Sequence, residues 1–129
     1  MLIVEDDPVF LRIMKEIVSS GFPSFSLFGA ANGKEAMEQF DAAGPQLVFM
    51  DISLPDTNGL KLTRAMKERN PNIRVVIVTN HDTPEHREAA YEAGADSFIS
   101  KSASIAREVE ASIRSLVASA GLNENNGSV

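Results

Sequence analysis

Short apolar runs recur along the chain and alternate with longer stretches of helical periodicity. Their starts lie roughly 22–28 residues apart, which is typical of a repeated strand–helix unit. The predicted strands are Met1–Val4, Phe25–Ala30, Leu47–Met50, Val75–Thr79 and Phe98–Ile99. The predicted helices are Pro8–Ser19, Gly33–Ala43, Gly59–Arg69, Pro84–Ala93 and Ser104–Ser119. This alternation predicts an α/β fold, a parallel sheet with helices on both faces.

The predicted helices differ in the apolar face that each offers to the sheet. In the first helix the face contains Val9, Ile13 and Ile17. In the last helix it contains Ile105, Val109, Ile113 and Leu116. Both sets follow helical spacing. The fourth helix offers only small apolar side chains, Ala89, Ala90 and Ala93, with Tyr91 beside them. Because little buried area holds it, we expect this helix to move at low cost.

The polarity of the strands predicts their order in the sheet. Leu2–Val4, Leu47–Met50 and Val75–Val78 are continuously apolar, which is typical of central strands buried on both faces. Ser24–Leu27 alternates and Ser97–Ser100 has polar ends, so the second and fifth strands are predicted at the edges. The resulting order, 2-1-3-4-5, is the flavodoxin-like doubly wound arrangement. In that fold, ligands bind beyond the carboxyl ends of the first and third strands.

Composition narrows the possible functions. The chain has 129 residues, no Cys and a net charge of −6. The lack of Cys excludes a disulfide scaffold, a Cys-based zinc site and a thiol nucleophile. The acidic balance argues against direct nucleic-acid binding, and no apolar run is long enough for a membrane span. We expect one domain over residues 1–119, followed by a flexible tail over residues 120–129.

Polar residues whose side chains could bind a metal ion or take part in a reaction follow the predicted strands. Glu5 and Asp6 follow the first, Asp51 the third, Thr79 ends the fourth, and Lys101 comes shortly after the fifth. Each alone has an ordinary interpretation as a helix cap, a turn residue or a solvated side chain. Glu5, Asp6 and Asp51 would repel one another beyond the carboxyl ends of the first and third strands. A hard divalent cation, which takes oxygen ligands, would remove the energetic cost of this repulsion. Magnesium suits such a site best.

A cation beside a carboxylate, a hydroxyl and an ammonium group favours phosphoryl chemistry. Asp51 could act as a nucleophile and carry the phosphoryl group as an acyl phosphate. Thr79, Lys101 and the cation could then compensate the charge on its oxygens. The chain contains no Gly-x-x-x-x-Gly-Lys or Gly-x-Gly-x-x-Gly sequence. Since it has no nucleotide-binding loop of this kind, the phosphoryl group must arrive on another donor.

Five segments together resemble the receiver domains of two-component response regulators. They are Leu2–Asp7, Asn32–Ala36, Met50–Gly59, Val78–Asn80 and Gly94–Lys101. Each is a weak signal alone, but all five in order are specific, and the resemblance covers about residues 1–119. One departure is Phe98, where many members of the family have Tyr, so this side chain has no hydroxyl for an outward hydrogen bond.

The resemblance implies a role for each site residue. Asp51 would be the phosphoacceptor and Asp6 a direct Mg²⁺ ligand. Glu5 would act mainly through water, and the carbonyl of Ser53 would be a further ligand. The remaining implied roles are phosphoryl contacts by Thr79 and Lys101, an aromatic switch at Phe98, and control of the phosphoryl lifetime at Ser53 and His81.

The resemblance also implies partners and a setting. The donor would be a sensor histidine kinase or a phosphotransfer protein, and a downstream effector or output domain would recognise the fourth helix, fifth strand and fifth helix. We expect a cytoplasmic monomer or weak dimer with no membrane partner. Two alternatives stay open: an aspartyl-nucleophile phosphohydrolase, and a scaffold that works without phosphorylation. Ser53 counts against the hydrolase, which would need an acid two residues after Asp51.

Overall fold

The computed structural model describes residues 1–120 of the chain. Its strands are β1 (Leu2–Val4), β2 (Phe28–Ala30), β3 (Leu47–Met50), β4 (Arg74–Thr79) and β5 (Ser97–Ser100). Its helices are α1 (Pro8–Gly21), α2 (Gly33–Ala43), α3 (Gly59–Arg69), α4 (Pro84–Glu92) and α5 (Ile105–Ala120). The strands form one sheet in the order β2-β1-β3-β4-β5. All the paired strands are parallel, so the predicted fold class and strand order are confirmed.

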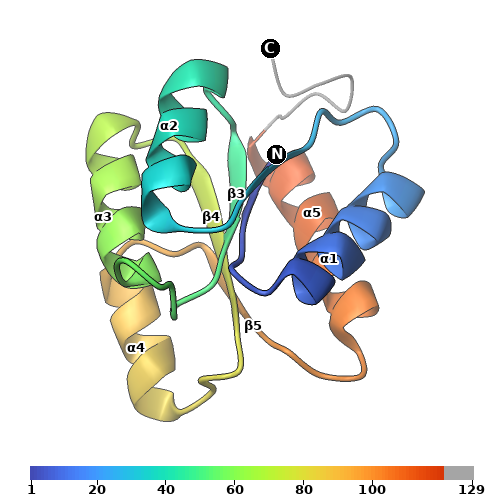
Figure 1. Cartoon of the computed structure of the whole chain (residues 1–129). Coiled ribbons are helices and arrows are strands. Elements are labelled where there is room, and N and C mark those ends of the chain that lie inside the picture. Colours follow the sequence, from blue (N-terminus) through green and yellow to red (C-terminus); the bar gives the residue numbers. More distant parts are fainter. Residues whose placement is uncertain (121–129) are drawn as a thin grey trace.

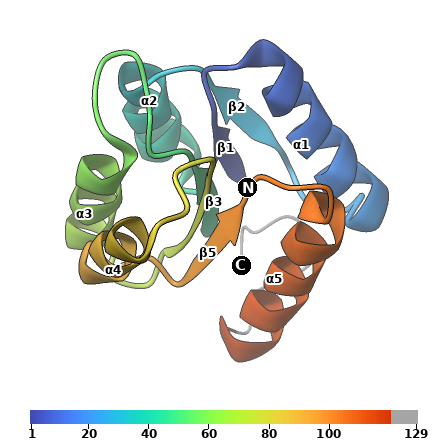
Figure 2. The same cartoon turned by 90° about the horizontal axis from the view of Figure 1, so that it is seen from below.

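The helices cover the two faces of the sheet unequally. Helices α1 and α5 lie on one face, and α2, α3 and α4 lie on the other (Figures 1 and 2). Successive side chains of each central strand point to opposite faces, so every central strand contributes to two apolar layers. In β3, for example, Val48 and Met50 face the layer under α2 and α3, whereas Phe49 faces the layer under α1 and α5. This is why the central strands are apolar without interruption.

The prediction of the second strand was wrong at its start. The strand begins at Phe28, and the alternating residues before it form a loop. Phe25 is buried in that loop, where its ring meets the edge of Phe22 at a centroid distance of 6.1 Å. The alternation of Ser24–Leu27 therefore reflects packing of the loop against the end of α1.

The predicted buried face of the first helix was also wrong. Val9 and Ile13 are 54% and 39% exposed, whereas Met14 and Val18 are buried. The cause is that α1 carries apolar residues around much of its circumference, so more than one stripe fits the helical period. The stripe that faces β1, β3 and α5 is the one that is buried. The predicted face of α5 is confirmed, because Val109 and Ile113 are fully buried.

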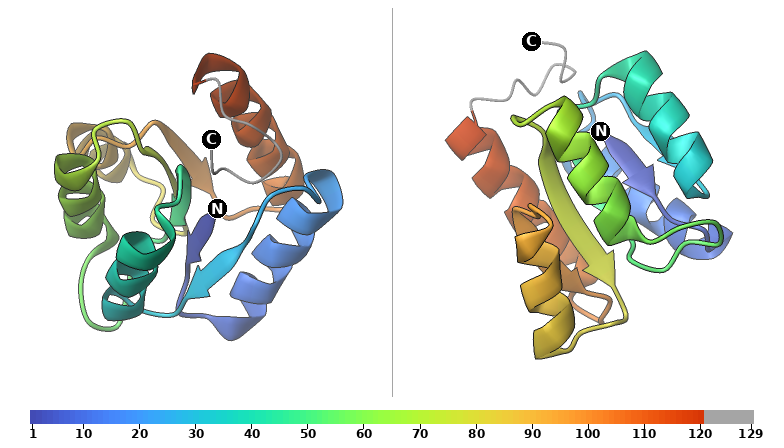
Figure 3. Two further views of the ribbon diagram at one scale, coloured as in Figure 1. Left: turned by 90° about the horizontal axis from the view of Figure 1, so that it is seen from above. Right: turned by 90° about the vertical axis from the view of Figure 1, so that its left-hand side faces the viewer.

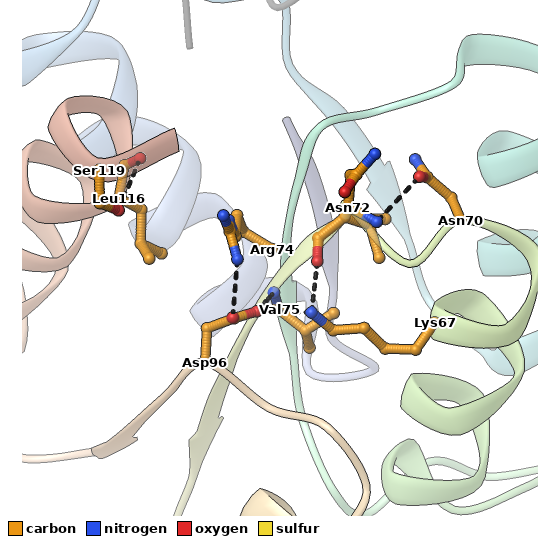
Figure 4. A network of polar contacts seen from close by, with 9 residues as sticks. Lys67, Asn70, Asn72, Arg74, Val75, Asp96, Leu116 and Ser119 are labelled. Carbon is orange, nitrogen blue, oxygen red and sulfur yellow. Dashed lines mark hydrogen bonds and ion pairs between the residues drawn. The ribbon is translucent and has the colours of Figure 1, made fainter. Parts of the chain in front are cut away.

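A polar network fixes the amino-terminal ends of β4 and β5, at the opposite edge from the candidate site (Figure 4). Asp96 accepts the backbone N–H of Val75 at 2.8 Å and pairs with Lys67 at 2.9 Å and Arg74 at 3.3 Å. The network ties α3 to the sheet and sets where β5 begins. Figure 3 shows α3 and α4 side by side over these strands.

None of the helices within residues 1–120 has the length and apolar character needed to cross a membrane. Of the predicted tail over residues 120–129, residues 121–129 lie outside the described residues. Helix α5 continues to Ala120, one residue further than predicted.

Candidate functional site

The predicted site residues meet at the carboxyl edge of the sheet. Strands β1 and β3 are adjacent and parallel, so the residues that follow them, Glu5 and Asp51, emerge side by side. The backbone N–H of Asp51 donates to the carbonyl of Val4 at 3.1 Å, and that of Glu5 donates to Ala30 at 2.9 Å. These hydrogen bonds extend the sheet beyond the strands and hold the two acidic residues in register.

Three carboxylates form a compact acidic cluster. One oxygen from each of Glu5, Asp6 and Asp51 lies within 4.8 Å of the others. Glu5 and Asp51 are buried, whereas Asp6 is exposed at the rim. Carboxylate oxygens at this spacing suit a hard divalent cation, and the exposed edge leaves room for the waters that such an ion keeps.

Lys101 supplies a positive charge to the same cluster. Its Nζ lies 2.8 Å from Glu5 Oε1 and 3.2 Å from Asp51 Oδ2. Burial raises the pKa of Glu5, and its hydrogen bonds with Lys101 and the Asp7 N–H only partly offset this effect. For Lys101, burial is the largest single influence and lowers the pKa. The hydrogen bond to Glu5 and the charges of Asp51 and Glu5 outweigh it, so the pKa is raised.

Thr79 is the last residue of β4, the strand next to β3 in the sheet. It is fully buried, and its hydroxyl accepts the backbone N–H of His81 at 3.2 Å. Its carbonyl accepts the backbone N–H of Lys101 at 2.9 Å. Since a hydroxyl that accepts one hydrogen bond can still donate another, Thr79 keeps a proton available for an oxygen at the site.

Ser53 and His81 lie together in the loops above the edge of the sheet. Ser53 Oγ and His81 Nε2 are 2.7 Å apart in a hydrogen bond whose direction depends on the histidine tautomer. The His81 ring stacks on that of His86 at a centroid distance of 5.2 Å. The two residues that were expected to control the phosphoryl lifetime are therefore joined to each other and to the start of α4.

Phe98 lies in β5, two residues before the carboxyl end of the strand, and its side chain faces the core. It is only 7% exposed and packs with the apolar residues under α3 and α4. The Arg87 guanidinium carbon lies 4.7 Å from the centre of its ring. Arg87 also makes two hydrogen bonds to the carboxylate of Asp82, at 2.6 and 3.1 Å. Helix α4 is thus attached to β5 and to the loop after β4 through one arginine.

Three contributors to the site were missed in the sequence. The ring of Phe10 lies under Lys101, with Nζ 4.4 Å from its centre. Asp56 accepts the first two backbone N–H groups of α2, at 2.8 and 3.0 Å. Gly59 lets α3 begin against the chain at Asp51, because a Cβ there would lie 2.0 Å from the Asp51 carbonyl oxygen. Only the Asn-Gly pair at residues 58–59 gave a local signal, and it indicated a turn.

Comparison with known proteins agrees with this geometry. The family model for the response regulator receiver domain matches residues 1–113. The transcriptional activator protein ExaE of Pseudomonas putida is 32% identical over 96% of the chain, and the chemotaxis protein CheY of Thermotoga maritima is 31% identical over 85%. The crystal structure of a CheY-like receiver domain protein from Methanospirillum hungatei superposes with a TM-score of 0.84 at 27% sequence identity. The superposition covers 93% of this chain and 94% of the chain in that crystal structure.

The chain belongs to the response regulator receiver domain family and is a signalling module of two-component systems. It spans 92% of the Thermotoga CheY but only 58% of ExaE. The chain covers 58%, 44% and 51% of three longer curated relatives, and so spans about half of their length.

Proposed function

We propose that the chain is a phosphorylation-controlled switch in which Asp51 accepts the phosphoryl group. The observation that carries the proposal is the surroundings of this buried carboxylate. Glu5 and Asp6 lie close enough to share one cation with it, and the Lys101 ammonium is 3.2 Å away. A carboxylate placed between a cation site and a lysine can receive a group with charged oxygens.

The acidic cluster fits Mg²⁺ as the resident ion. Asp6 is exposed and free to be a direct ligand, together with Asp51 and the carbonyl of Ser53. Both oxygens of Glu5 already accept hydrogen bonds, from Lys101 and from the Asp7 N–H, so this side chain acts through water. When bound, Mg²⁺ supplies positive charge for the oxygens of the incoming group.

The chemical step is an in-line displacement at phosphorus. A carboxylate oxygen of Asp51 attacks the phosphorus of a phosphohistidine, and the phosphorus–nitrogen bond breaks with its electron pair left on the imidazole. The product is an acyl phosphate on Asp51. The Lys101 ammonium and the Thr79 hydroxyl donate to the phosphoryl oxygens in both the transition state and the product.

Helix α1 offers the donor a place to approach. It begins directly beside the acidic cluster, and its exposed apolar residues, Val9 and Ile13, lie on the solvent side. A histidine kinase or phosphotransfer protein that covers these residues brings its phosphohistidine toward Asp51. The setting of this exchange is the cytoplasm.

The response passes from Thr79 to the face of α4, β5 and α5. A phosphoryl group on Asp51 draws the Thr79 hydroxyl toward it and pulls the loop that carries His81. Helix α4 is free to follow, because Ala90 is the one residue of Pro84–Glu92 that is buried. Phe98 rearranges beneath it. An effector, an output domain or a second copy of the chain then binds the altered face.

Acetyl phosphate and intact-mass spectrometry test the proposal. In the presence of Mg²⁺ we expect a single added phosphoryl group per chain. Asp51→Asn abolishes the addition and Asp6→Ala weakens Mg²⁺ binding, followed by backbone NMR shifts. The matched control is Asp41→Asn, which removes the same charge from an exposed aspartate of α2 and leaves phosphorylation unchanged.

The same experiment separates the alternatives. A folded parent that takes up no phosphoryl group under any Mg²⁺ concentration would favour the scaffold. Continued turnover of a generic phosphatase substrate at enzyme-like rates would favour the hydrolase.

A further inference from the structure

The ammonium group of Lys101 sits in a three-sided cradle. Two sides are carboxylates, with Glu5 Oε1 at 2.8 Å and Asp51 Oδ2 at 3.2 Å. The third is the face of the Phe10 ring, whose centre lies 4.4 Å from Nζ. The lysine side chain is only 13% exposed, so water has little access to its charge.

The start of helix α1 builds two sides of this cradle together. Asp7 caps the helix by accepting the N–H groups of Val9 and Phe10 through Oδ1. The backbone N–H of Asp7 itself donates to Glu5 Oε2 at 3.1 Å. One short segment therefore orients both the Glu5 carboxylate and the Phe10 ring around the same ammonium.

We propose that Phe10 is a positioning residue for Lys101 in phosphoryl transfer, an inference that rests on the proposed function. An aromatic face attracts a cation through its quadrupole. Unlike a hydrogen-bond acceptor, the face does not fix one direction of approach. Lys101 can therefore shift from Glu5 toward a phosphoryl group on Asp51 while it stays over the ring.

The ring also limits water beneath the site. A hollow of about 10 Å³ is lined by Glu5, Phe10 and Asp51 among others, which is space for no more than one water. A smaller side chain in place of Phe10 would enlarge this hollow and hydrate the ammonium. Hydration would weaken the charge that Lys101 presents to the transferred group.

Two substitutions at Phe10 separate the effect of the aromatic face from the effect of the volume that the side chain fills. Phe10→Leu removes the aromatic face and keeps an apolar side chain, and the Mg²⁺-dependent phosphorylation rate with acetyl phosphate is expected to fall by about three- to ten-fold. Phe10→Tyr keeps the face, and its rate is expected to stay within about two-fold of the parent. The matched control is Phe22→Leu, which removes a ring 5.7 Å from the Arg114 guanidinium at the other end of α1 and leaves the rate unchanged.

NMR supplies a readout that does not depend on phosphorylation. In the parent, the ε-methylene protons of Lys101 are expected to be shifted upfield by the ring current and to show contacts with the Phe10 ring protons. The upfield shift disappears in Phe10→Leu and persists in Phe22→Leu.

Equal phosphorylation rates in Phe10→Leu and the parent would overturn the proposal, as would the lack of ring contacts to Lys101 in the parent. Should Phe10→Leu fail to fold, missing ring contacts in the parent, or a rate for Phe10→Tyr that falls by more than about two-fold, would still overturn the proposal. A parent that shows the ring contacts but takes up no phosphoryl group would refute the proposed function and leave the cradle intact.

Discussion

Replacing Gly59 with Ala should displace the backbone at Asp51 without changing any charged group of the site. The added Cβ would lie 2.0 Å from the Asp51 carbonyl oxygen and 2.9 Å from its carbonyl carbon. An ordinary contact needs 3.4 Å or more. The start of α3 or the chain at Asp51 must therefore move by about 1 Å or more to remove the overlap.

Neither segment can move freely. The backbone N–H of Gly59 donates to Ile52 at 2.8 Å, and that of Asp51 donates to Val4 at 3.1 Å. Forced overpacking costs about 1–3 kcal/mol and a strained hydrogen bond about 1 kcal/mol, whereas the better helix propensity of Ala returns up to about 1 kcal/mol. With these contributions combined, we expect a net loss of about 1–3 kcal/mol in the free energy of unfolding, or about 5–15 °C in Tm.

Urea denaturation of the parent, Gly59→Ala and Gly33→Ala measures this effect. A Cβ at Gly33 would meet Thr57 Cγ2 at 2.4 Å, but that atom is the end of a side chain that can rotate, so the loss should stay below about 1 kcal/mol. Phosphorylation of Asp51 should also slow in Gly59→Ala, because a displacement of about 1 Å can cost about 100-fold in rate. The reasoning fails if Gly59→Ala is as stable as the parent, or if Gly33→Ala costs as much.

Three further substitutions probe the loops around the site. The pKa of Asp56 is lowered, mainly by its hydrogen bond from the Gly33 N–H, so the stabilisation it gives is complete above its ordinary value of 3.8 and is lost as the pH falls through the folded-state value. Asp56→Asn should lower Tm at neutral pH, and the difference from the parent should vanish in acid; a constant difference would contradict this. Arg87→Met should speed amide hydrogen exchange in α4, because the helix loses its hydrogen bonds to Asp82; unchanged exchange would show that the helix is held by other contacts. His81→Ala should change the decay rate of phosphorylated protein several-fold, or roughly 1 kcal/mol in the barrier, measured by mass spectrometry after removal of the donor; identical decay would place the residue outside the path of the attacking water.

The fold could be predicted because its signals are local. Three uninterrupted apolar runs mark the central strands, and polar ends mark β5 as an edge. The two errors arose where local pattern permits more than one arrangement. Residues Val9 and Met14 both lie on acceptable apolar stripes of α1, and only the positions of the sheet and α5 select the stripe of Met14. Phe25 is buried as a strand residue would be, but in a loop.

The acidic half of the site could be predicted for a related reason. Glu5 and Asp51 each follow a central strand, so the strand order alone brings them together. Phe10, Arg87 and Asp56 left no such trace, because their roles depend on contacts between side chains of different elements. An aromatic residue in the first turn of an amphipathic helix is ordinary in any sequence, and only the position of Lys101 gives it a function.

The place of β5 in the sheet also determines when the site can exist. Glu5 and Asp51 precede Lys101 by a large part of the chain, and Lys101 is brought to them only when β5 pairs with β4 at the edge. During synthesis the chain emerges from its amino terminus, so the two buried acids are made long before their counter-charge. Until β5 adds to the sheet, burying them is opposed by their mutual repulsion. In a nascent chain that stops short of Lys101, the two acids therefore lack the counter-charge that the folded site gives them.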